Sequence, residues 1–444
     1  MQAVILAAGN GKRLEPFTVT RPKVIFPIAN KPLLAHVIDG LGKAGINNII
    51  VITGRDDSRI KNYFSGRKKP KLEFLKDAEA CGTAFSLLKA KDKIKEDFIL
   101  IYGDIYTACE NYKIIMESPP LSAGVCTHIE PSKGMGAKVE KGKITSFSLK
   151  ARWEEETSAT HAIAGIFHLD KRVFPCLENN PGYFSRVPPG MEAVMETELL
   201  QSLHEMTKEF PIKAVPLKEP LVDIDMPWQI LDANNSALNE IDNSTKKSKI
   251  SASAKINTKY YERLVADEGS IVEEGVRLTG CVHIGKNTVI YSGTHIYGPA
   301  VIGDNCRIGP HAWIANSSIG NEVHIGHCAE IYGVILDKVY CMHYSYISGV
   351  IGENTNLGAA TVCGTLRHDD REILMRIGTR LESTGKRGLG CFIGDYCRTG
   401  VNTMIMAGRK IGPFSAAGAG VLVSLDIPAH KLVTLNQDLK TYDW

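Results

Sequence analysis

The chain has 444 residues, of which 44% are hydrophobic and 23% are charged, and its formal net charge is +3. This length predicts two domains with ordinary globular cores. The sequence shows no run of about eighteen apolar residues, no secretory leader pattern and no basic block interleaved with aromatic residues, so we expect no membrane span, no signal peptide and no nucleic-acid partner.

The eleven cysteines form no CxxC pair and show no zinc-finger spacing. Scattered cysteines among apolar neighbours are typical of a reducing compartment. We therefore expect reduced thiols and a cytoplasmic location.

The first half of the chain alternates strand-like and helix-like segments. Apolar runs predict strands at 2–8, 47–53 and 97–104, and helical patterns occupy 30–45 and 82–94. Asn30 is the predicted N-cap of the first helix, and Gly45 marks its end. This alternation predicts an α/β domain over residues 1–230, with parallel strands joined by right-handed crossovers. Ligands of such sheets bind beyond the carboxyl ends of the strands.

The stretch "LAAGNGKRLEPFTVTRPK", residues 6–23, follows the first predicted strand. It is neither a Walker A motif nor a complete dinucleotide fingerprint. Gly9 and Gly11 allow backbone N–H groups to approach phosphates closely. Arg13 can bind the same phosphates through two N–H donors of its guanidinium, and Lys23 through its compact ammonium charge. The alternative is a solvated basic loop, which the two charged residues alone would favour.

Residues 231–262 are predicted to be a connector. The segment 230–241, "ILDANNSALNEI", suits a helix, and the polar stretch that follows it, rich in serine and lysine, suits a linker.

A period of six governs the second half. Isoleucine occurs at positions 284, 290, 296, 302, 308 and 314, then at 319, 325 and 331. The period of six returns near the end with Ile393, Thr399, Ile405, Ile411, Ala417 and Val423. This hexapeptide repeat predicts that residues 263–444 form a β-helix whose triangular coils stack the repeated side chain inward. Cys391 and Cys397, six residues apart, are predicted to be core thiols on adjacent coils.

Several motifs of the first half, taken in order, resemble sugar-1-phosphate nucleotidyltransferases. They are the stretch at 6–23, "GTA" at 82–84, "YGD" at 102–104, "GMGAKVEKGKI" at 134–144 and "VDIDMPWQILDANNSAL" at 222–238. Joined to hexapeptide repeats, the chain resembles the bifunctional enzymes of UDP-N-acetylglucosamine synthesis, and the archaeal versions above all. The resemblance implies a Rossmann-like mixed sheet followed by a left-handed β-helix.

The resemblance also implies a first site. It assigns Arg13 and Lys23 to catalysis, Asp104 and Asp223 to Mg²⁺, and Gly136 and Lys150 to the sugar, with Asp225 as a rival to Asp223. The implied nucleotide-binding residues are Leu6, Ala7, Ala8, Gly9, Gly11, Gly82, Thr83 and Gly103. The sugar subsite departs from the family, because Leu149 stands where a glutamate is usual and Ile163 where an asparagine is usual.

A second implied site lies in the repeats. "MHYSYISG" makes His343 the base for acetyl transfer and Tyr346 a sugar-phosphate contact, and "NTNLGAA" places Asn356 at the acceptor sugar and Ala359 at acetyl-CoA. This site departs from the family as well, because Val350 replaces the aspartate expected after the glycine. Acetyl transfer is therefore an open question at this stage.

The resulting expectation is an enzyme that transfers a nucleotidyl group from an NTP, with UTP favoured, to a sugar-1-phosphate, with N-acetylglucosamine-1-phosphate favoured. It would also acetylate an amino-sugar-1-phosphate with acetyl-CoA, and it would assemble as a homotrimer or a dimer of trimers. Two alternatives stay open: a mannose- or glucose-1-phosphate guanylyl- or thymidylyltransferase with a purely structural β-helix, or a non-catalytic assembly protein of the same layout.

Overall fold

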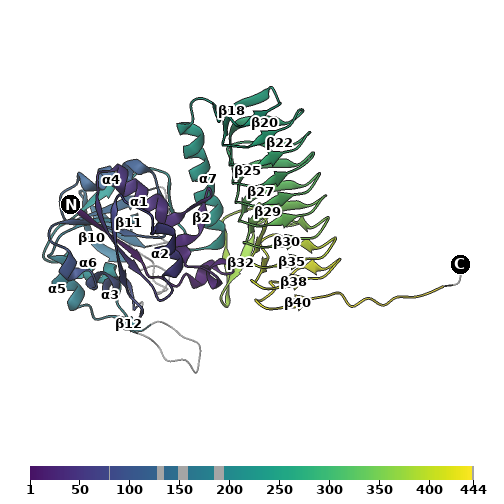
Figure 1. Cartoon of the computed structure of the whole chain (residues 1–444). Helices are drawn as coiled ribbons and strands as arrows, with labels where there is room; N and C mark the ends of the chain where they lie inside the picture. Colours follow the sequence, from purple (N-terminus) through teal and green to yellow (C-terminus); the bar gives the residue numbers. More distant parts are fainter. Residues whose placement is uncertain (80, 128–134, 149–158, 185–194, 443–444) are drawn as a thin grey trace. The chain divides into compact units, whose positions relative to one another are not determined.

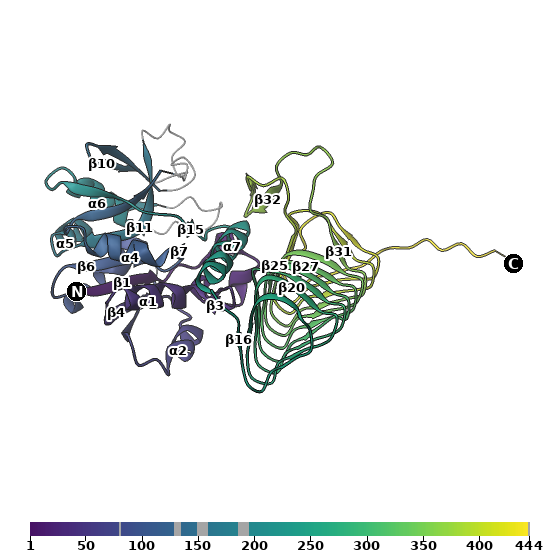
Figure 2. The same cartoon turned by 90° about the horizontal axis from the view of Figure 1, so that it is seen from above.

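The computed structural model describes residues 1–79, 81–127, 135–148, 159–184 and 195–442, and these form two compact units (Figures 1 and 2). Unit 1 comprises residues 1–10, 22–25 and 32–223, and unit 2 comprises 11–21, 26–31 and 224–444. The sequence placed the boundaries at 230 and 262, and it did not anticipate that two N-terminal segments cluster with the repeats. Lys150 and Leu149 fall outside the described residues.

Unit 1 is built on a nine-stranded mixed sheet with the order β5-β4-β1-β6-β11-β8-β14-β10-β9. β5, β4, β1 and β6 are parallel, whereas β11 runs antiparallel to β6 and β8. The mixed Rossmann-like sheet implied by the resemblance is thus confirmed. Its strands are β1 (Gln2–Ala7), β4 (Asn48–Thr53), β5 (Lys71–Lys76), β6 (Phe98–Tyr102), β8 (Ser122–Cys126), β9 (Gly136–Glu140), β10 (Lys143–Ser148), β11 (His161–Leu169) and β14 (Ile212–Pro216).

Short helices and strand pairs complete unit 1. The helical segments are η3 (Lys23–Ile25), α1 (Leu33–Lys43), α2 (Ser58–Phe64), α3 (Thr83–Leu88), η4 (Lys91–Lys93), α4 (Cys109–Met116), α5 (Val173–Glu178) and α6 (Leu199–Met206). The small antiparallel pairs are β7 (Ile105–Thr107) with β15 (Leu221–Asp223), and β12 (Tyr183–Phe184) with β13 (Met195–Glu196).

Helix α1 begins later than the sequence predicted. Its N-cap is Pro32 rather than Asn30. The Asn30 side chain instead donates a hydrogen bond to the carbonyl of Ile319, within unit 2. Capping at Asn30 is therefore wrong, because the helix begins at Leu33 and Asn30, with φ +61°, lies two residues before the N-cap. The helix ends as predicted before Gly45, whose φ of +104° suits a residue without a Cβ.

Unit 2 is a stack of β-coils with a triangular outline in Figure 2. Its strands are β16 (Lys249–Ile250), β17 (Lys255–Ile256), β18 (Tyr260–Ala266), β19 (Ile271–Val272), β20 (Arg277–Ile284), β21 (Val289–Ile290), β22 (His295–Tyr297), β23 (Ala300–Ile302), β24 (Arg307–Ile308), β25 (Trp313–Ile319), β26 (His324–Ile325), β27 (Glu330–Ile335), β28 (Tyr340–Cys341), β29 (Tyr346–Ile351), β30 (Asn356–Leu357), β31 (Val362–Cys363), β34 (Cys391–Ile393), β35 (Arg398–Thr399), β36 (Met404–Ile405), β37 (Lys410–Ile411), β38 (Ala416–Ala417), β39 (Leu422–Val423) and β40 (Leu432–Val433).

The predicted inward stacking is confirmed. The repeated positions are buried, and each packs on its equivalent one coil away, as Ile290 does on Ile308. Six residues are therefore one side of a coil. The expectation that Cys391 and Cys397 stack on adjacent coils is wrong. Cys391 instead has its sulfur 2.9 Å from that of Cys363, and all eleven cysteines are free thiols.

Unit 2 also contains segments outside the coils. They are η1 (Lys12–Leu14), η2 (Phe17–Val19), β2 (Pro27–Ile28), helix α7 (Pro227–Ser244) and the hairpin of β32 (Leu374–Ile377) and β33 (Arg380–Ser383); β3 (Lys31–Pro32) pairs with β2 and ends at the unit boundary. The polar stretch predicted to be a linker forms the end of α7 and the first coil. Ser and Lys suit it because such coils expose the outward positions of every strand. Within the described residues, no helix is long and apolar enough to cross a membrane.

Candidate functional sites

In unit 1 the predicted phosphate loop begins at the carboxyl edge of the parallel strands. Leu6 on β1 lies in register with Ile52 on β4 and Tyr102 on β6, so the residues after these strands meet at one edge. The Gly103 N–H donates to the Leu6 carbonyl at 2.8 Å. A Cβ at Gly54, just after β4, would lie 2.7 Å from the carbonyl oxygen of Ala8. Sequence reasoning missed Gly54, which lacks any motif of its own.

The carboxylates of Asp104 and Asp223 come together through strand pairing. β15 runs antiparallel to β7 and places Asp223 opposite Ile105, the residue after Asp104. One carboxylate oxygen of each lies within 4.8 Å of the other, and the Lys23 ammonium is 2.7 Å from Asp104. Two carboxylates at this distance repel each other unless positive charge lies nearby. The donor set therefore suits a hard divalent cation, which prefers carboxylate oxygens.

Tyr102, the last residue of β6, is buried and lies two residues before Asp104. Burial raises the pKa of its phenol well above the usual value, and the negative charges of Glu198, Asp104 and Asp223 raise it further. The phenol therefore stays protonated across the physiological range. The resemblance gave roles to Gly103 and Asp104 of the YGD motif and none to this tyrosine.

The "GTA" turn is fixed by contacts to residues 197–199. Gly82 has φ +102°, and a Cβ there would lie 2.2 Å from the Thr197 carbonyl oxygen. The Thr83 hydroxyl donates to Glu198 at 2.5 Å and accepts from the Leu199 N–H at 2.8 Å. The hydroxyl of the predicted nucleotide-binding turn is thus engaged, and so are the Ala84 N–H, which donates to the Thr197 carbonyl at 2.9 Å, and the Gly82 carbonyl, which accepts from the Ser86 N–H at 3.1 Å.

The predicted sugar contact Gly136 begins β9, opposite Ala162 of β11. Its neighbour Met135 accepts a hydrogen bond from the Ile163 N–H at 2.8 Å. Ile163 is buried and apolar, so this position offers no side-chain polar group to a sugar. The departure noted in the sequence is therefore located beside the predicted sugar contact.

Gly11 and Arg13 belong to the segment 11–21 of unit 2. Gly11 has φ +63°, and its carbonyl accepts from the Leu14 N–H at 2.9 Å and the Thr18 hydroxyl at 2.8 Å. Arg13 pairs with Asp225 at 2.7 Å while its side chain remains 59% exposed. The loop is thus internally braced, with a guanidinium that solvent and ligands can reach.

His343 lies at a corner of the coils. The corner residues of successive coils are linked by backbone hydrogen bonds, from Tyr344 to His327 at 3.2 Å and from Ala360 to His343 at 3.0 Å. The imidazoles of His327 and His343 stack with centroids 5.1 Å apart, and Tyr344 meets His343 edge-on at 5.3 Å. His343 and Ala359 thus occupy equivalent corners of neighbouring coils. His327 joins them in the structure, although the sequence gave it no role.

The other two predicted residues of the second site lie on strands. Tyr346 begins β29, half-buried, with its ring 5.8 Å from that of Tyr332, and Asn356 begins β30. Their grouping with the histidine remains a prediction.

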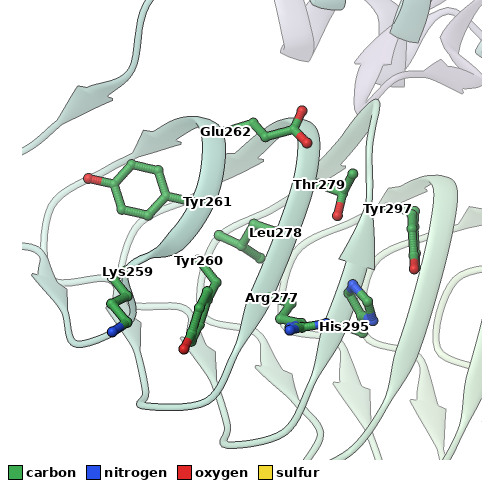
Figure 3. Close-up of a pocket in the computed structure, with 9 residues that line it drawn as sticks. All are labelled: Lys259, Tyr260, Tyr261, Glu262, Arg277, Leu278, Thr279, His295 and Tyr297. Atoms are coloured by element: carbon green, nitrogen blue, oxygen red, sulfur yellow. The ribbon is translucent and has the colours of Figure 1, made fainter.

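A shallow hollow of about 360 Å³ lies on the first coils, and none of the residues that line it is assigned to either site (Figure 3). Tyr260, Arg277 and His295 occupy successive positions of one ladder along it. The Arg277 guanidinium lies 5.5 Å from the Tyr260 ring, and burial and that guanidinium lower the pKa of His295.

Comparison with known proteins agrees with these two units. Residues 2–177 match the nucleotidyl transferase family, and residues 281–316 match the bacterial transferase hexapeptide family. The bifunctional sugar-1-phosphate nucleotidylyltransferase/acetyltransferase of Sulfurisphaera tokodaii is 31% identical over 442 residues, 96% of this chain and 98% of that protein. The chain belongs to this bifunctional family. The protein is accordingly a nucleotidyltransferase, with a nucleotidyltransferase unit and a left-handed β-helix.

Other members show the same full-length match. The bifunctional protein GlmU of Methanococcus maripaludis strain S2 is 32% identical over 445 residues, 99% of this chain and 98% of that protein. The GlmU of Methanocaldococcus jannaschii is 29% identical over 443 residues, with 99% and 98% covered. The archaeal resemblance read from the motifs is confirmed.

Proposed function

We propose that this protein transfers the uridylyl group of UTP to N-acetylglucosamine-1-phosphate and that its β-helix acetylates glucosamine-1-phosphate with acetyl-CoA. In the first reaction a sugar-phosphate oxygen attacks the α-phosphorus, and the bond from that phosphorus to the bridging oxygen breaks to release pyrophosphate. In the second, the amine attacks the thioester carbonyl, and coenzyme A leaves as its thiol.

The cluster of Lys23, Asp104 and Asp223 carries the first part of the proposal. Joining two anions requires positive charge at the place where they meet. Asp104 and Asp223 would hold Mg²⁺, which supplies charge neutralisation and polarises the phosphoryl oxygens when bound. Lys23 adds an ammonium to the same edge, and Arg13 is assigned to the pyrophosphate. The main-chain groups of residues 6–9, 11, 82–83 and 103 are assigned to the nucleotide.

His343 carries the second part. Acetylation needs a base that removes a proton from the attacking amine, and a half-buried imidazole at a coil corner suits that task. Ala359 in the neighbouring corner has a small side chain that leaves room for acetyl-CoA. Tyr346 and Asn356 are assigned to the acceptor sugar.

A different sugar is the second candidate, because Ile163 replaces a polar residue beside Gly136. A site that must hydrogen-bond an acetamido group loses selectivity when the partner is apolar. The second candidate is therefore transfer to mannose- or glucose-1-phosphate with another nucleotide, and the β-helix would then serve assembly.

Assembly through the coils is also proposed, with the homotrimer as the expected state. Val362, Met404 and Leu422 form a ladder of exposed apolar side chains on β31, β36 and β39. Exposed apolar ladders are typical of surfaces that pair with other chains. Light scattering on the purified protein measures the assembly directly.

One assay tests the activities. The protein is given Mg²⁺, each NTP in turn and a panel of sugar-1-phosphates, and pyrophosphate release is measured; acetyl-CoA with glucosamine-1-phosphate then tests thiol release. We expect the highest turnover with UTP and N-acetylglucosamine-1-phosphate. Preference for GTP or dTTP with mannose- or glucose-1-phosphate would favour the second candidate, and no pyrophosphate release with any pair would refute both.

A further inference from the structure

Within unit 2, the segment 11–21 ends in a buried ion-pair network with the coils. The Arg21 guanidinium donates to Asp395 at 2.5 Å and to Glu353 at 3.0 Å, and the Thr20 hydroxyl also donates to Asp395. The side chains of Arg21 and Asp395 are only 7% and 1% exposed. An arginine with two carboxylate partners in a buried setting is held in one place, because moving it would leave charges unpaired.

Apolar contacts support the same anchorage. Phe17, fully buried, packs edge-on against Phe392 with ring centroids 6.5 Å apart. The strand that carries Phe392 ends two residues before Asp395. The segment that carries Arg13 is therefore fastened at Phe17 and at Arg21, and it is braced at Gly11 by its own hydrogen bonds.

The two carboxylate oxygens of Asp395 have different partners, so a substitution can alter one interaction and keep the other. Its Oδ1 accepts the Glu353 N–H at 2.7 Å, and only Oδ2 faces Arg21. Other coils use the same position in the same way, since Asp337 accepts the Asn321 N–H at 2.7 Å and Asn321 accepts the Asp304 N–H at 2.8 Å. Asn321 demonstrates that an amide oxygen performs the backbone task.

From this geometry we infer that Asp395, with Glu353, is a positioning residue for nucleotidyl transfer. The β-helix carboxylates hold Arg21, and through it they hold the loop that presents Gly11 and Arg13 to the triphosphate. The inference rests on the nucleotidyl transfer proposed above. It makes the β-helix a working part of the first reaction, independent of any acetyl transfer.

The test compares Asp395→Asn with Asp337→Asn in the full-length protein. Both variants keep an oxygen for the backbone N–H, but only the first removes the charge that faces Arg21. Hydrogen exchange of the peptide covering 11–21, followed by mass spectrometry, reports on the anchorage without any activity. Steady-state pyrophosphate release and thiol release, measured on the same preparations, report on the consequence.

For Asp395→Asn we expect faster exchange in 11–21, a higher KM for UTP and a kcat/KM lower by about 10- to 100-fold, as loss of alignment typically produces. The KM for the sugar-1-phosphate and the thiol release should match those of Asp337→Asn. The double variant Asp395→Asn with Glu353→Gln should show a larger fall in kcat/KM for UTP than Asp395→Asn alone. Arg21→Lys, which keeps the charge, should show a smaller fall than Arg21→Met.

Three results would overturn the inference. Exchange equal in the two asparagine variants would show that Asp395 does not hold the loop, and faster exchange with unchanged UTP kinetics would show that the anchorage has no catalytic consequence. Parallel loss of both activities would indicate damage to the coils. A wild-type protein without pyrophosphate release would refute the proposed function instead, while the exchange comparison would still test the anchorage.

Discussion

The two candidate sites are assembled in different ways. In unit 1, Lys23, Asp104 and Asp223 are brought together by strand order and by the pairing of β7 with β15. In unit 2, the corner position recurs on each turn, so that His343 and Ala359 meet through the repeat itself. The first arrangement brings charged side chains together, which suits the joining of two phosphates. The second stacks imidazole rings, and an imidazole suits a proton transfer. The comparison teaches that one chain can build two chemically different sites, one by pairing strands of a mixed sheet and the other by repeating a coil.

If the sites are chemically separate, removing charge from the first should leave the second untouched. We expect Asp104→Asn and Lys23→Met each to lower pyrophosphate release by about 1,000-fold, because each removes a group aimed at the charge of the transition state. Thiol release should not change. Asp170→Asn, which alters a carboxylate paired with Arg172 at the surface, is the matched control and should retain both activities. Equal loss of both activities would contradict the separation.

The reverse experiment removes His343, the proposed base for acetyl transfer, from the β-helix. We expect His343→Ala to lower thiol release by about 100-fold or more, in the range typical of a lost general base, and to leave pyrophosphate release unchanged. His324→Ala is the control, because that imidazole stacks on Tyr340 at another position of the coil. Undiminished thiol release in His343→Ala would remove this histidine from the mechanism.

The cores should also respond separately. Ile308→Ala deletes a fully buried side chain that packs between Ile290 and Ile325, and such deletions cost about 2–5 kcal/mol. We expect calorimetry to show a lower transition temperature for the β-helix and little change for unit 1, with Ile5→Ala giving the opposite pattern. A single transition that shifts equally in both variants would show that the units unfold together.

The smallest effect concerns the turn at Gly82. Gly82→Ala places a Cβ 2.2 Å from the Thr197 carbonyl oxygen, whereas Gly45→Ala, at nearly the same φ, meets nothing within 4 Å. We expect Gly45→Ala to lower the free energy of unfolding by about 1–2 kcal/mol, the cost of holding a residue with a Cβ in the left-handed region. Gly82→Ala should lose more stability and raise the KM for UTP. Equal urea unfolding midpoints for Gly82→Ala and Gly45→Ala would show that the turn at residue 82 accommodates a Cβ by a small shift, without additional strain.

Local patterns carried much of this architecture. The period of six located the coils and their inward residues, and apolar runs located β1, β4 and β6, because burial of those side chains depends mainly on local spacing. Local patterns failed at Asn30, because the helix begins two residues later than the capping pattern indicates. They also failed over 242–259, where the polar residues form the end of α7 and the first coil instead of a linker. They also missed Gly54 and His327, which matter only through neighbours on other strands or coils.

The sequence by itself determined the two-part organisation, the repeat that builds the β-helix and the motifs that place the chain in its family. Each of these features depends only on which residue types occur a few positions apart. Only the tertiary structure decided that Cys391 meets Cys363, that Asn30 bonds to Ile319 and that the segment 11–21 joins the coils through Arg21. These contacts link residues far apart in the chain, and their formation depends on strand pairing and on the burial of opposite charges, which no local pattern records.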